Sequence, residues 1–337
     1  MIPRCRKYAV VGDKGEILLG RGVVADAFAR RLLRVVTHAH KDHTRGLKSS
    51  IRWSLYVLAT PVTFRFLEVL GETVPRDKRL ELSYNKRITV DGESIEFRRA
   101  RHIAGSAQVI VESSGCRVGY TGDFKLPGTD VLEDLDVLVV DATYGSPRYQ
   151  RRWSDWEALQ ALIELIEDRI RYGPVWIYGF HGKLQEVMIE LRKRGVNYPY
   201  LAEPVTIKLA KITSEEYGVN LGDTRSYLGG PVDESAIVFI HTSKRRGKVK
   251  LPGTHVRLTG WEVRSIVRMT GQNTFNVSFS DHATFREVIE YVRDANPKMV
   301  IIDAYRGKDA WYTAKYIERL LGIPATYMPK VKSVGKP

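Results

Sequence analysis

The sequence predicts an α/β protein in which a second α/β unit is inserted into a larger, sheet-rich body. Short β-rich runs, separated by Gly, Asp and Asn, fill the first half of the chain. Between about residues 148 and 260, strand-like and helix-like segments alternate instead. The last part has a helix followed by an apolar strand. An insertion explains why the beginning and the end look like parts of one body.

The first half is expected to consist mostly of strands. Each run is short, apolar and bounded by turn-forming residues, which is the usual pattern of a strand in a buried sheet. The expected strands cover residues 17–19, 32–36, 55–59, 95–98, 108–112, 117–121 and 137–141.

The pattern changes after Pro147. Ser154 and Glu157 form a capping-box pattern ahead of a helix expected over residues 156–171. Thr284 and Glu287 repeat this pattern before a helix that ends near residue 295. The other elements expected in this half are a helix at 184–194 and strands at 175–178, 236–241 and 299–303.

Composition limits where the protein works. In its 337 residues, 43% are hydrophobic, which is enough for a substantial core, and no apolar run is long enough to span a membrane. The first residues lack the apolar stretch of a signal peptide. Cys5 and Cys116 are the only cysteines, too few for a disulfide framework, so a reducing cytoplasm is expected. A metal site must then use His and Asp, which excludes zinc fingers.

The formal net charge of +14 indicates a polyanionic partner. Surface ion pairs cannot absorb such an excess of basic residues, so a nucleic acid is favoured over a merely charged surface. The basic residues cluster at 148–152, 244–250 and 330–336.

The stretch THAHKDH, residues 37–43, predicts a metal site. His38 and His40 lie two positions apart, so an extended backbone points both side chains the same way. Asp42 and His43 follow in the turn and can face a second point nearby. Imidazole and carboxylate groups are ligands that borderline divalent metals accept.

Two later stretches supply further ligands. RHIAGSAQV places His102 in a Gly-containing loop, and VGYTGDF places Asp123 directly after an expected strand. His38, His40 and His102 could hold one metal, and Asp42 and His43 a second, with Asp123 bridging them. Such a bridge allows two cations to sit about 3.5–4 Å apart, which suits in-line displacement at phosphorus.

Two more motifs place acids and a histidine where proton transfer could occur. DATYGSP puts Asp141 at the end of an expected strand, and SFSDHATF puts Asp281 and His282 just before a helix. An acid beside a histidine holds the imidazole oriented and protonated for general acid catalysis.

Taken together, these motifs resemble a known family. THAHKDH, HIAGSAQV, YTGDF, VVDATYG, RLTGW and SFSDHATF occur in the order typical of β-CASP nucleases of the metallo-β-lactamase fold. The resemblance spans nearly the whole chain. It is strongest to ligase-associated exonucleases and Artemis-type repair nucleases, and archaeal mRNA 3′-end-processing-like exonucleases are also similar.

The resemblance implies an αββα sandwich with an inserted α/β β-CASP cap. The sandwich would comprise residues 1–145 and 271–337, and the cap residues 146–270. The family's metal positions fall on His38, His40, Asp42, His43, His102 and Asp123, with Asp42 also taking part in catalysis. Asp26 matches the acid that supports the histidine motif, and Asp141 and His282 match the first two β-CASP motifs.

The stretch GFHGKLQEV resembles the cap's turn that approaches substrate phosphate. Its glycines, Gly179 and Gly182, would bring backbone N–H groups to an anion at a helix start. His181 and Lys183 could add contacts there. An ordinary strand-to-helix turn is the other interpretation.

One position departs from the family. Many members carry a third-motif histidine at the end of the strand expected at 299–303, but this chain reads VIIDAYRGKD there. Artemis-type members also lack that histidine. The second metal would then bind weakly, or Asp303 would substitute as a ligand or support, and Tyr305 or Arg306 would contact nucleic acid.

The expected activity is metal-assisted phosphodiester hydrolysis, with His282 oriented by Asp141 to protonate the leaving 3′-oxygen. Zn²⁺ is the expected cofactor, firmly bound at one site, and Mn²⁺ a substitute. A DNA exonuclease on single-stranded or end-exposed DNA in repair is favoured, with a ligase as a possible partner. RNA processing is the alternative. A catalytically dead nucleic-acid-binding module and a small-molecule hydrolase are weaker hypotheses, because the first metal site is complete and the cap motifs are present.

Overall fold

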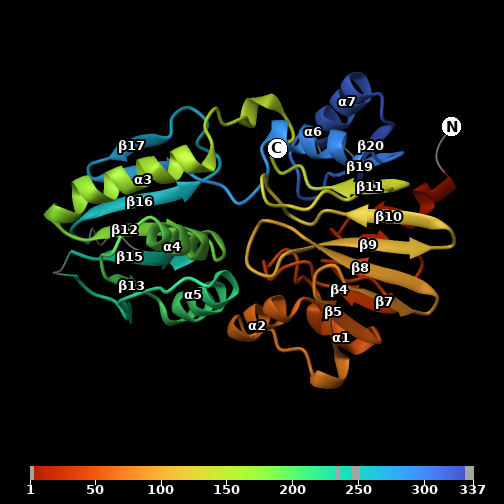
Figure 1. Ribbon diagram of the computed structural model, residues 1–337, viewed down its shortest axis with the longest axis horizontal. Helices are drawn as coiled ribbons and strands as arrows, with labels where there is room; N and C mark the ends of the chain where they lie inside the picture. Colours follow the sequence, from red (N-terminus) through yellow and green to blue (C-terminus); the bar gives the residue numbers. More distant parts are fainter. Residues whose placement is uncertain (1–3, 233–234, 245–250, 331–337) are drawn as a thin grey trace, which may run out of the picture. The chain divides into compact units, whose positions relative to one another are not determined.

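The computed structural model describes residues 4–232, 235–244 and 251–330 of the chain, and the basic stretches 245–250 and 331–336 lie outside these ranges. Two compact units make up the chain: residues 1–150 with 282–337, and residues 151–281 (Figure 1). The second unit is therefore inserted into the first. The first boundary lies at 150/151 instead of the expected 145/146. The second lies at 281/282 instead of 270/271, because a strand at Thr274–Ser278 pairs within the sheet of the inserted unit.

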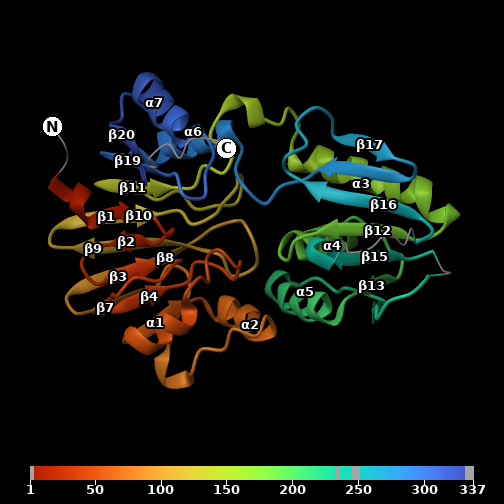
Figure 2. The ribbon, with the colours of Figure 1, turned by 180° about the vertical axis from the view of Figure 1, so that it is seen from behind.

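The first unit contains two mixed sheets among its described residues (Figure 2). One has the strand order β1 (Ala9–Val11), β2 (Ile17–Leu19), β3 (Val23–Ala25), β4 (Leu33–Val35), β5 (Tyr56–Ala59) and β6 (Arg79–Glu81). The other has the order β20 (Ala325–Met328), β19 (Val300–Asp303), β11 (Val137–Val140), β10 (Cys116–Tyr120), β9 (Ala107–Ser113), β8 (Glu93–Arg99) and β7 (Arg87–Val90).

The two sheets share a core, and helices flank them. Buried side chains of β2 and β4 pack with those of β9, β10 and β11 in one apolar cluster. Helices α6 (Phe285–Ala295) and α7 (Ala310–Leu321) cover the outer face of the second sheet, where Val288 and Ile317 join Leu138 and Ile302. Helices α1 (Leu47–Trp53) and α2 (Pro61–Val69) flank the first sheet (Figure 2). This arrangement confirms the expected four-layer sandwich.

A disulfide joins Cys5 to Cys116, which the cysteine count did not predict. Cys5 lies in a short 3-10 turn at Arg4–Tyr8, and Cys116 begins β10. Their Cα atoms are 5.5 Å apart, within the range that a disulfide can span. A pair separated by 111 residues leaves no local signal in the sequence.

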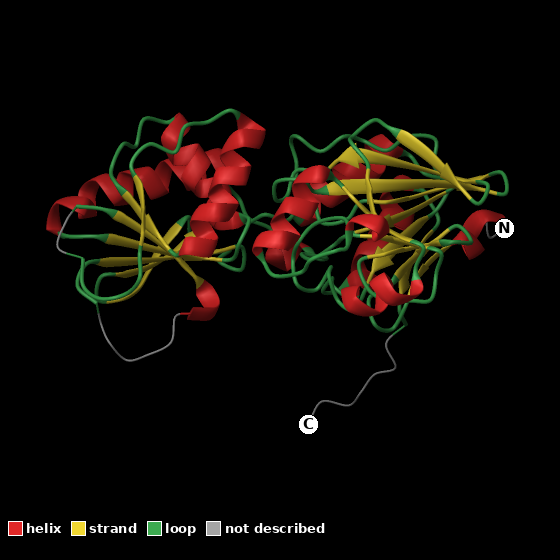
Figure 3. Ribbon diagram, turned by 90° about the horizontal axis from the view of Figure 1, so that it is seen from below, coloured by secondary structure: helices red, strands yellow, loops and turns green. Residues whose placement is uncertain are grey.

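The inserted unit has one sheet with helices on one face (Figure 3). Its sheet is parallel except for β17, with the order β14 (Thr224–Ser226), β13 (Tyr200–Ala202), β15 (Ile237–His241), β12 (Val175–Gly179), β16 (Thr254–Thr259), β18 (Thr274–Ser278) and β17 (Val267–Gly271). The helices are α3 (Asp155–Arg169), α4 (Lys183–Lys193) and α5 (Pro204–Tyr217), and their apolar sides pack together with Ile177 and Phe239. The other face carries a smaller apolar cluster around Trp176.

Both expected capping boxes are confirmed. The hydroxyl of Ser154 accepts the N–H of Glu157, and the Glu157 carboxylate accepts the N–H of Ser154 at the start of α3. Thr284 and Glu287 make the same exchange at the start of α6. Among the described residues, no helix is long and apolar enough to cross a membrane.

Candidate metal and active site

Strand direction gathers the polar motifs at one edge of the second sheet. β10, β11 and β19 are parallel, and β8 runs in the same direction because β8 and β10 both pair antiparallel with β9. Their carboxyl ends therefore share one edge. In the first sheet, β3 and β4 are likewise parallel. Each of these six strands, β3, β4, β8, β10, β11 and β19, is followed shortly after its carboxyl end by a polar residue. In the same order, these residues are Asp26, His38, His102, Asp123, Asp141 and Arg306.

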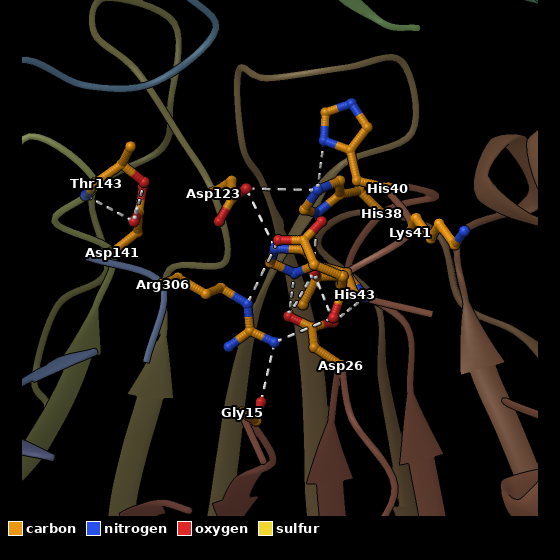
Figure 4. A network of polar contacts seen from close by, with 12 residues as sticks. Gly15, Asp26, His38, His40, Lys41, His43, Asp123, Asp141, Thr143 and Arg306 are labelled. Carbon is orange, nitrogen blue, oxygen red and sulfur yellow. Dashed lines mark hydrogen bonds and ion pairs between the residues drawn. The ribbon is translucent and has the colours of Figure 1, made fainter. Parts of the chain in front are cut away.

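Three imidazoles and one carboxylate converge there, as Figure 4 shows in part. Ligand atoms of His38, His40, His102 and Asp123 all lie within 4.8 Å of one another. Oδ2 of Asp123 is 3.6 Å from Nε2 of His38 and also 3.6 Å from Nε2 of His102. Sequence motifs that are far apart in the chain thus meet at one point.

These residues fit a divalent cation. Three imidazole nitrogens and a carboxylate are a common donor set for Zn²⁺. Oδ1 of Asp123 is buried and accepts no hydrogen bond from the described residues, which is costly unless a cation satisfies it. Burial, together with the neighbouring His43 and His102, holds the pKa of His38 well below its usual value, so His38 is neutral and keeps a lone pair.

The loop that carries His102 is tied to the start of α2. The carbonyl of Gly105 accepts hydrogen bonds from Oγ1 of Thr60, at 2.7 Å, and from Oγ1 of Thr63, at 2.9 Å. Gly105 has φ +85°, and a Cβ there would lie 2.7 Å from the Thr63 nitrogen. Only glycine permits this close approach, which explains its place in HIAGSAQV.

Asp42 and His43 lie beside the first ligand set. Nε2 of His43 is 3.3 Å from Oδ2 of Asp42 and 3.2 Å from Oδ2 of Asp123. On the other side of the ring, Nδ1 is 2.7 Å from Oδ2 of Asp26. Burial disfavours the imidazolium, but Asp123 and Asp26 outweigh burial and raise the pKa of His43 well above its usual value.

Asp26 connects the ends of β3 and β4. Its carboxylate accepts the backbone N–H of Thr37 at 3.0 Å and the Thr37 hydroxyl at 2.8 Å. The structure therefore places Asp26 behind the histidine motif, in contact with His43, where it orients a ring that faces Asp123. Thr37 was not singled out from the sequence, although it directly precedes the first histidine.

Asp141 and His282 form a pair next to Asp123. Nδ1 of His282 is 3.2 Å from Oδ2 of Asp141 and 3.8 Å from Oδ2 of Asp123. Thr143 supports both, since its hydroxyl is 2.9 Å from Oδ1 of Asp141 and 3.2 Å from Nδ1 of His282. Burial and the charge of Asp123 raise the pKa of Asp141. Thr143 was also missed by sequence reasoning, and its only signal is its position two residues after Asp141.

Asp303 does not face the ligand set as a substitute ligand. It is fully buried, and Oδ2 accepts Nη1 of Arg306 at 2.8 Å. Oδ1 accepts the backbone N–H groups of Tyr305 and Arg306 at 2.9 and 3.2 Å. The side chain of Arg306 is itself only 5% exposed, and its contact with nucleic acid stays a prediction. The ion pair between Asp303 and Arg306 explains why both side chains are buried.

The expected phosphate-binding turn of the inserted unit is satisfied internally. The backbone N–H of Gly182 donates to Oε1 of Gln185 at 2.6 Å. The buried ammonium of Lys183 lies 3.1 Å from Oδ1 of Asp281, so Lys183 forms an ion pair instead of projecting towards a ligand. The ring of His181 stacks on that of His241, with 4.2 Å between their centroids. These contacts favour an ordinary, well-capped helix start, and phosphate binding at this turn stays a prediction.

Comparison with known proteins decides the family. Residues 33–170 match the β-lactamase superfamily domain. A protein of Acidianus ambivalens, described as an uncharacterized protein in the lig 3′ region, is 44% identical over 125 residues, which cover 36% of this chain and 88% of that one. Artemis of Gallus gallus is 24% identical and covers 78% of this chain. The chain belongs to the β-CASP nucleases of the metallo-β-lactamase fold.

Another relative is named as a ribonuclease. The probable RNase MJ4 of Methanocaldococcus jannaschii is 21% identical, and the match covers 86% of this chain and 87% of that one. The present chain spans only 43% of the length of chicken Artemis. Family membership thus accounts for the metal centre, while the two names differ in the nucleic acid they suggest.

Proposed function

We propose that the protein is a metal-dependent nuclease that hydrolyses phosphodiester bonds in DNA, acting as an exonuclease on single-stranded or end-exposed DNA during repair. The observation that carries the proposal is the meeting of His38, His40, His102 and Asp123 beside the Asp141–His282 pair. Zn²⁺ is the proposed cofactor, with Mn²⁺ as a substitute. The net charge of +14 favours a polyanionic substrate.

Each part of the site has a separate task. A divalent cation on the three histidines and Asp123 would supply Lewis acidity towards water and a phosphoryl oxygen. Asp141 accepts from Nδ1 of His282 and so fixes the orientation of the ring. The protonated ring then donates from Nε2 to the leaving 3′-oxygen, and the other product keeps a 5′-phosphate. Asp26 interacts with Nδ1 of His43 and so keeps the other ring nitrogen, Nε2, directed at Asp123.

The DNA assignment is supported by relatives. Artemis and a protein named for its place beside a lig gene are both similar to this chain, and a ligase is accordingly the proposed partner. RNA processing is the second candidate, favoured by the RNase relative, which matches over most of its length. A nucleic-acid substrate favours the cytoplasm. The Cys5–Cys116 disulfide does not exclude this compartment, because intracellular proteins of hyperthermophiles are often disulfide-rich.

The test compares substrates and variants side by side. End-labelled single-stranded DNA, duplex DNA and RNA are incubated with the protein and Zn²⁺ or Mn²⁺, with and without chelator. We expect DNA to shorten from its ends, and Asp123→Ala and His282→Ala to abolish this. Asp77→Ala, an exposed acid, is the matched control. Equal, chelator-resistant cleavage by all variants would contradict the proposal, and a wide preference for RNA would replace DNA by the second candidate.

A further inference from the structure

The buried guanidinium of Arg306 lies against the half of the site that contains Asp42 and His43 (Figure 4). Its Nη1 donates to Asp303 at 2.8 Å, and its Nη2 donates to the Gly15 carbonyl at 2.9 Å. Nη2 also reaches the carbonyl of Asp42 at 3.5 Å. With three acceptors from three separate parts of the chain, the group has a fixed position.

The remaining nitrogen points towards the ligands. Nε of Arg306 is buried, makes no hydrogen bond within the described residues, and lies 3.9 Å from Oδ2 of Asp42. That same oxygen is 3.3 Å from Nε2 of His43. Asp42 would be the first carboxylate to hold a second cation here, and a guanidinium already neutralises it.

A second cation also lacks ligands. The strand end that would supply one carries Asp303, and both oxygens of Asp303 are engaged by Arg306 and by backbone N–H groups. Of the expected ligands, Asp42, His43 and the shared Asp123 lie together at this position. Three protein ligands with water in the remaining position can hold a catalytic ion, but here one of the three, Asp123, is shared with the first ion.

Charge disfavours a second cation further. A cation bound to Oδ2 of Asp42 would sit beside the guanidinium, and two positive groups at such short range repel. Because the Asp42 side chain is 56% exposed, water weakens this repulsion without removing it. Arg306 cannot relieve the repulsion by losing its proton. A guanidinium stays protonated in proteins.

We infer that Arg306 permanently takes the place of a second metal ion, so that the centre binds a single ion on His38, His40, His102 and Asp123. Arg306 is then a positioning residue: it holds Asp42 in place and supplies positive charge on the side of the site where a second ion would supply it. This inference rests on the metal centre of the proposed function, but it concerns how many ions that centre holds.

The experiment counts metal ions per folded chain. The full-length protein is loaded with Zn²⁺, and separately with Co²⁺, then freed of excess metal and analysed by mass spectrometry, with the Co²⁺ visible spectrum as a second readout. We expect one equivalent for wild type and for Arg306→Lys, which keeps the charge. Arg306→Gln keeps hydrogen-bonding groups but removes the charge, and it should accept a second equivalent. Arg293→Gln, at an exposed arginine of the same unit, should bind as wild type does.

The outcomes separate the inference from the proposed function. Two firm equivalents in wild type, or a single equivalent in folded Arg306→Gln, would overturn the inference. Wild type that binds no metal would overturn the metal centre itself. If Arg306→Gln does not fold, Arg306→Met with Asp303→Asn, which removes both charges of the buried pair and adds no imidazole, is loaded and judged by the same two counts.

Discussion

Nδ1 of His43 lies 2.7 Å from Oδ2 of Asp26, and neither side chain has any exposed surface. The other nitrogen of the same ring is 3.2 Å from Asp123, at the centre of the ligand set. Asp26 therefore sets the orientation of the His43 ring. It does so from the side of the ring opposite to Asp123.

Replacing Asp26 with Asn should weaken the centre without removing a ligand. Loss of the charge leaves the His43 imidazolium with a poorer partner, and outer-shell changes of this kind cost about 10–100-fold in metal affinity. Breaking the buried pair should also lower the free energy of unfolding by about 3–5 kcal/mol. Chelator competition and thermal denaturation measure the two effects. Asp77→Asn serves as the control, and an unchanged affinity in Asp26→Asn would show that the pair is dispensable.

The Asp141–His282 pair should matter for turnover more than for metal content. His282→Ala removes the proposed proton donor, and we expect kcat to fall by about 10²–10⁴-fold. Asp141→Asn should cost nearly as much, and the double variant little more, because the two residues act as a unit. Thr143→Val, which removes only the supporting hydroxyl, should lose less. Cleavage by His282→Ala at the wild-type rate would remove His282 from the mechanism.

The stability of the metal-free protein should depend on pH through His43 and Asp26. His43 has a pKa raised above 6.5 despite burial, because Asp123 and Asp26 favour its charged form. Its contribution is thus complete below pH 6.5 and is lost as pH rises through the raised pKa. Burial raises the pKa of Asp26, but His43 lowers it more, so Asp26 contributes above pH 3.8 and loses this as pH falls through its lowered pKa.

These two contributions are therefore complete together between pH 3.8 and 6.5. The melting temperature in the presence of chelator should fall as pH rises above that window. In His43→Asn that fall should be smaller. Parallel curves for wild type and His43→Asn across pH 4–9 would mean that the pair does not contribute in this way.

The Cys5–Cys116 disulfide should stabilise the first unit. It closes a loop with a sequence separation of 111 residues, and removing a native disulfide typically costs about 2–5 kcal/mol. Urea unfolding of Cys5→Ser with Cys116→Ser should show this loss relative to oxidised wild type. Reduced wild type should match the double variant. If reduction leaves the unfolding midpoint of wild type unchanged, the bond does not contribute.

Lys183 should support the fold of the inserted unit. Lys183 and Asp281 are both nearly buried, and removing one partner of such a pair leaves an uncompensated charge that costs about 3–5 kcal/mol. We expect Lys183→Met to destabilise strongly, and Lys183→Met with Asp281→Leu to recover much of the loss. A phosphate-binding lysine would behave differently: Lys183→Met would weaken DNA binding at unchanged melting temperature.

The sequence predicted the residues whose signal is local. His38, His40, His102 and Asp123 lie in short polar motifs directly after apolar strands, and the direction of β8 and β10 then brings them together. Strand β4 and helix α6 were expected within about a residue of their observed bounds, because a buried apolar run and a capping box mark their ends.

What sequence reasoning missed depends on partners far away in the chain. The ion pairs of Lys183 and Arg306 and the bond between the cysteines join residues that no local pattern connects. Strands β6 and β7 are half exposed at sheet edges, so their apolar signal is weak. The end of the inserted unit was expected at residue 270 but lies at residue 281. Strand β18 belongs to this unit because it pairs with β16, and the sequence alone does not show that pairing.

The interruption of the first unit by the second has a consequence for synthesis. All the metal ligands, from His38 to Asp123, leave the ribosome before the inserted unit, whereas His282 and Arg306 follow it. A nascent or prematurely terminated chain that stops within the insertion therefore carries every ligand for the ion but lacks its proton donor and its guanidinium. Unfinished copies are therefore expected to lack the proposed activity.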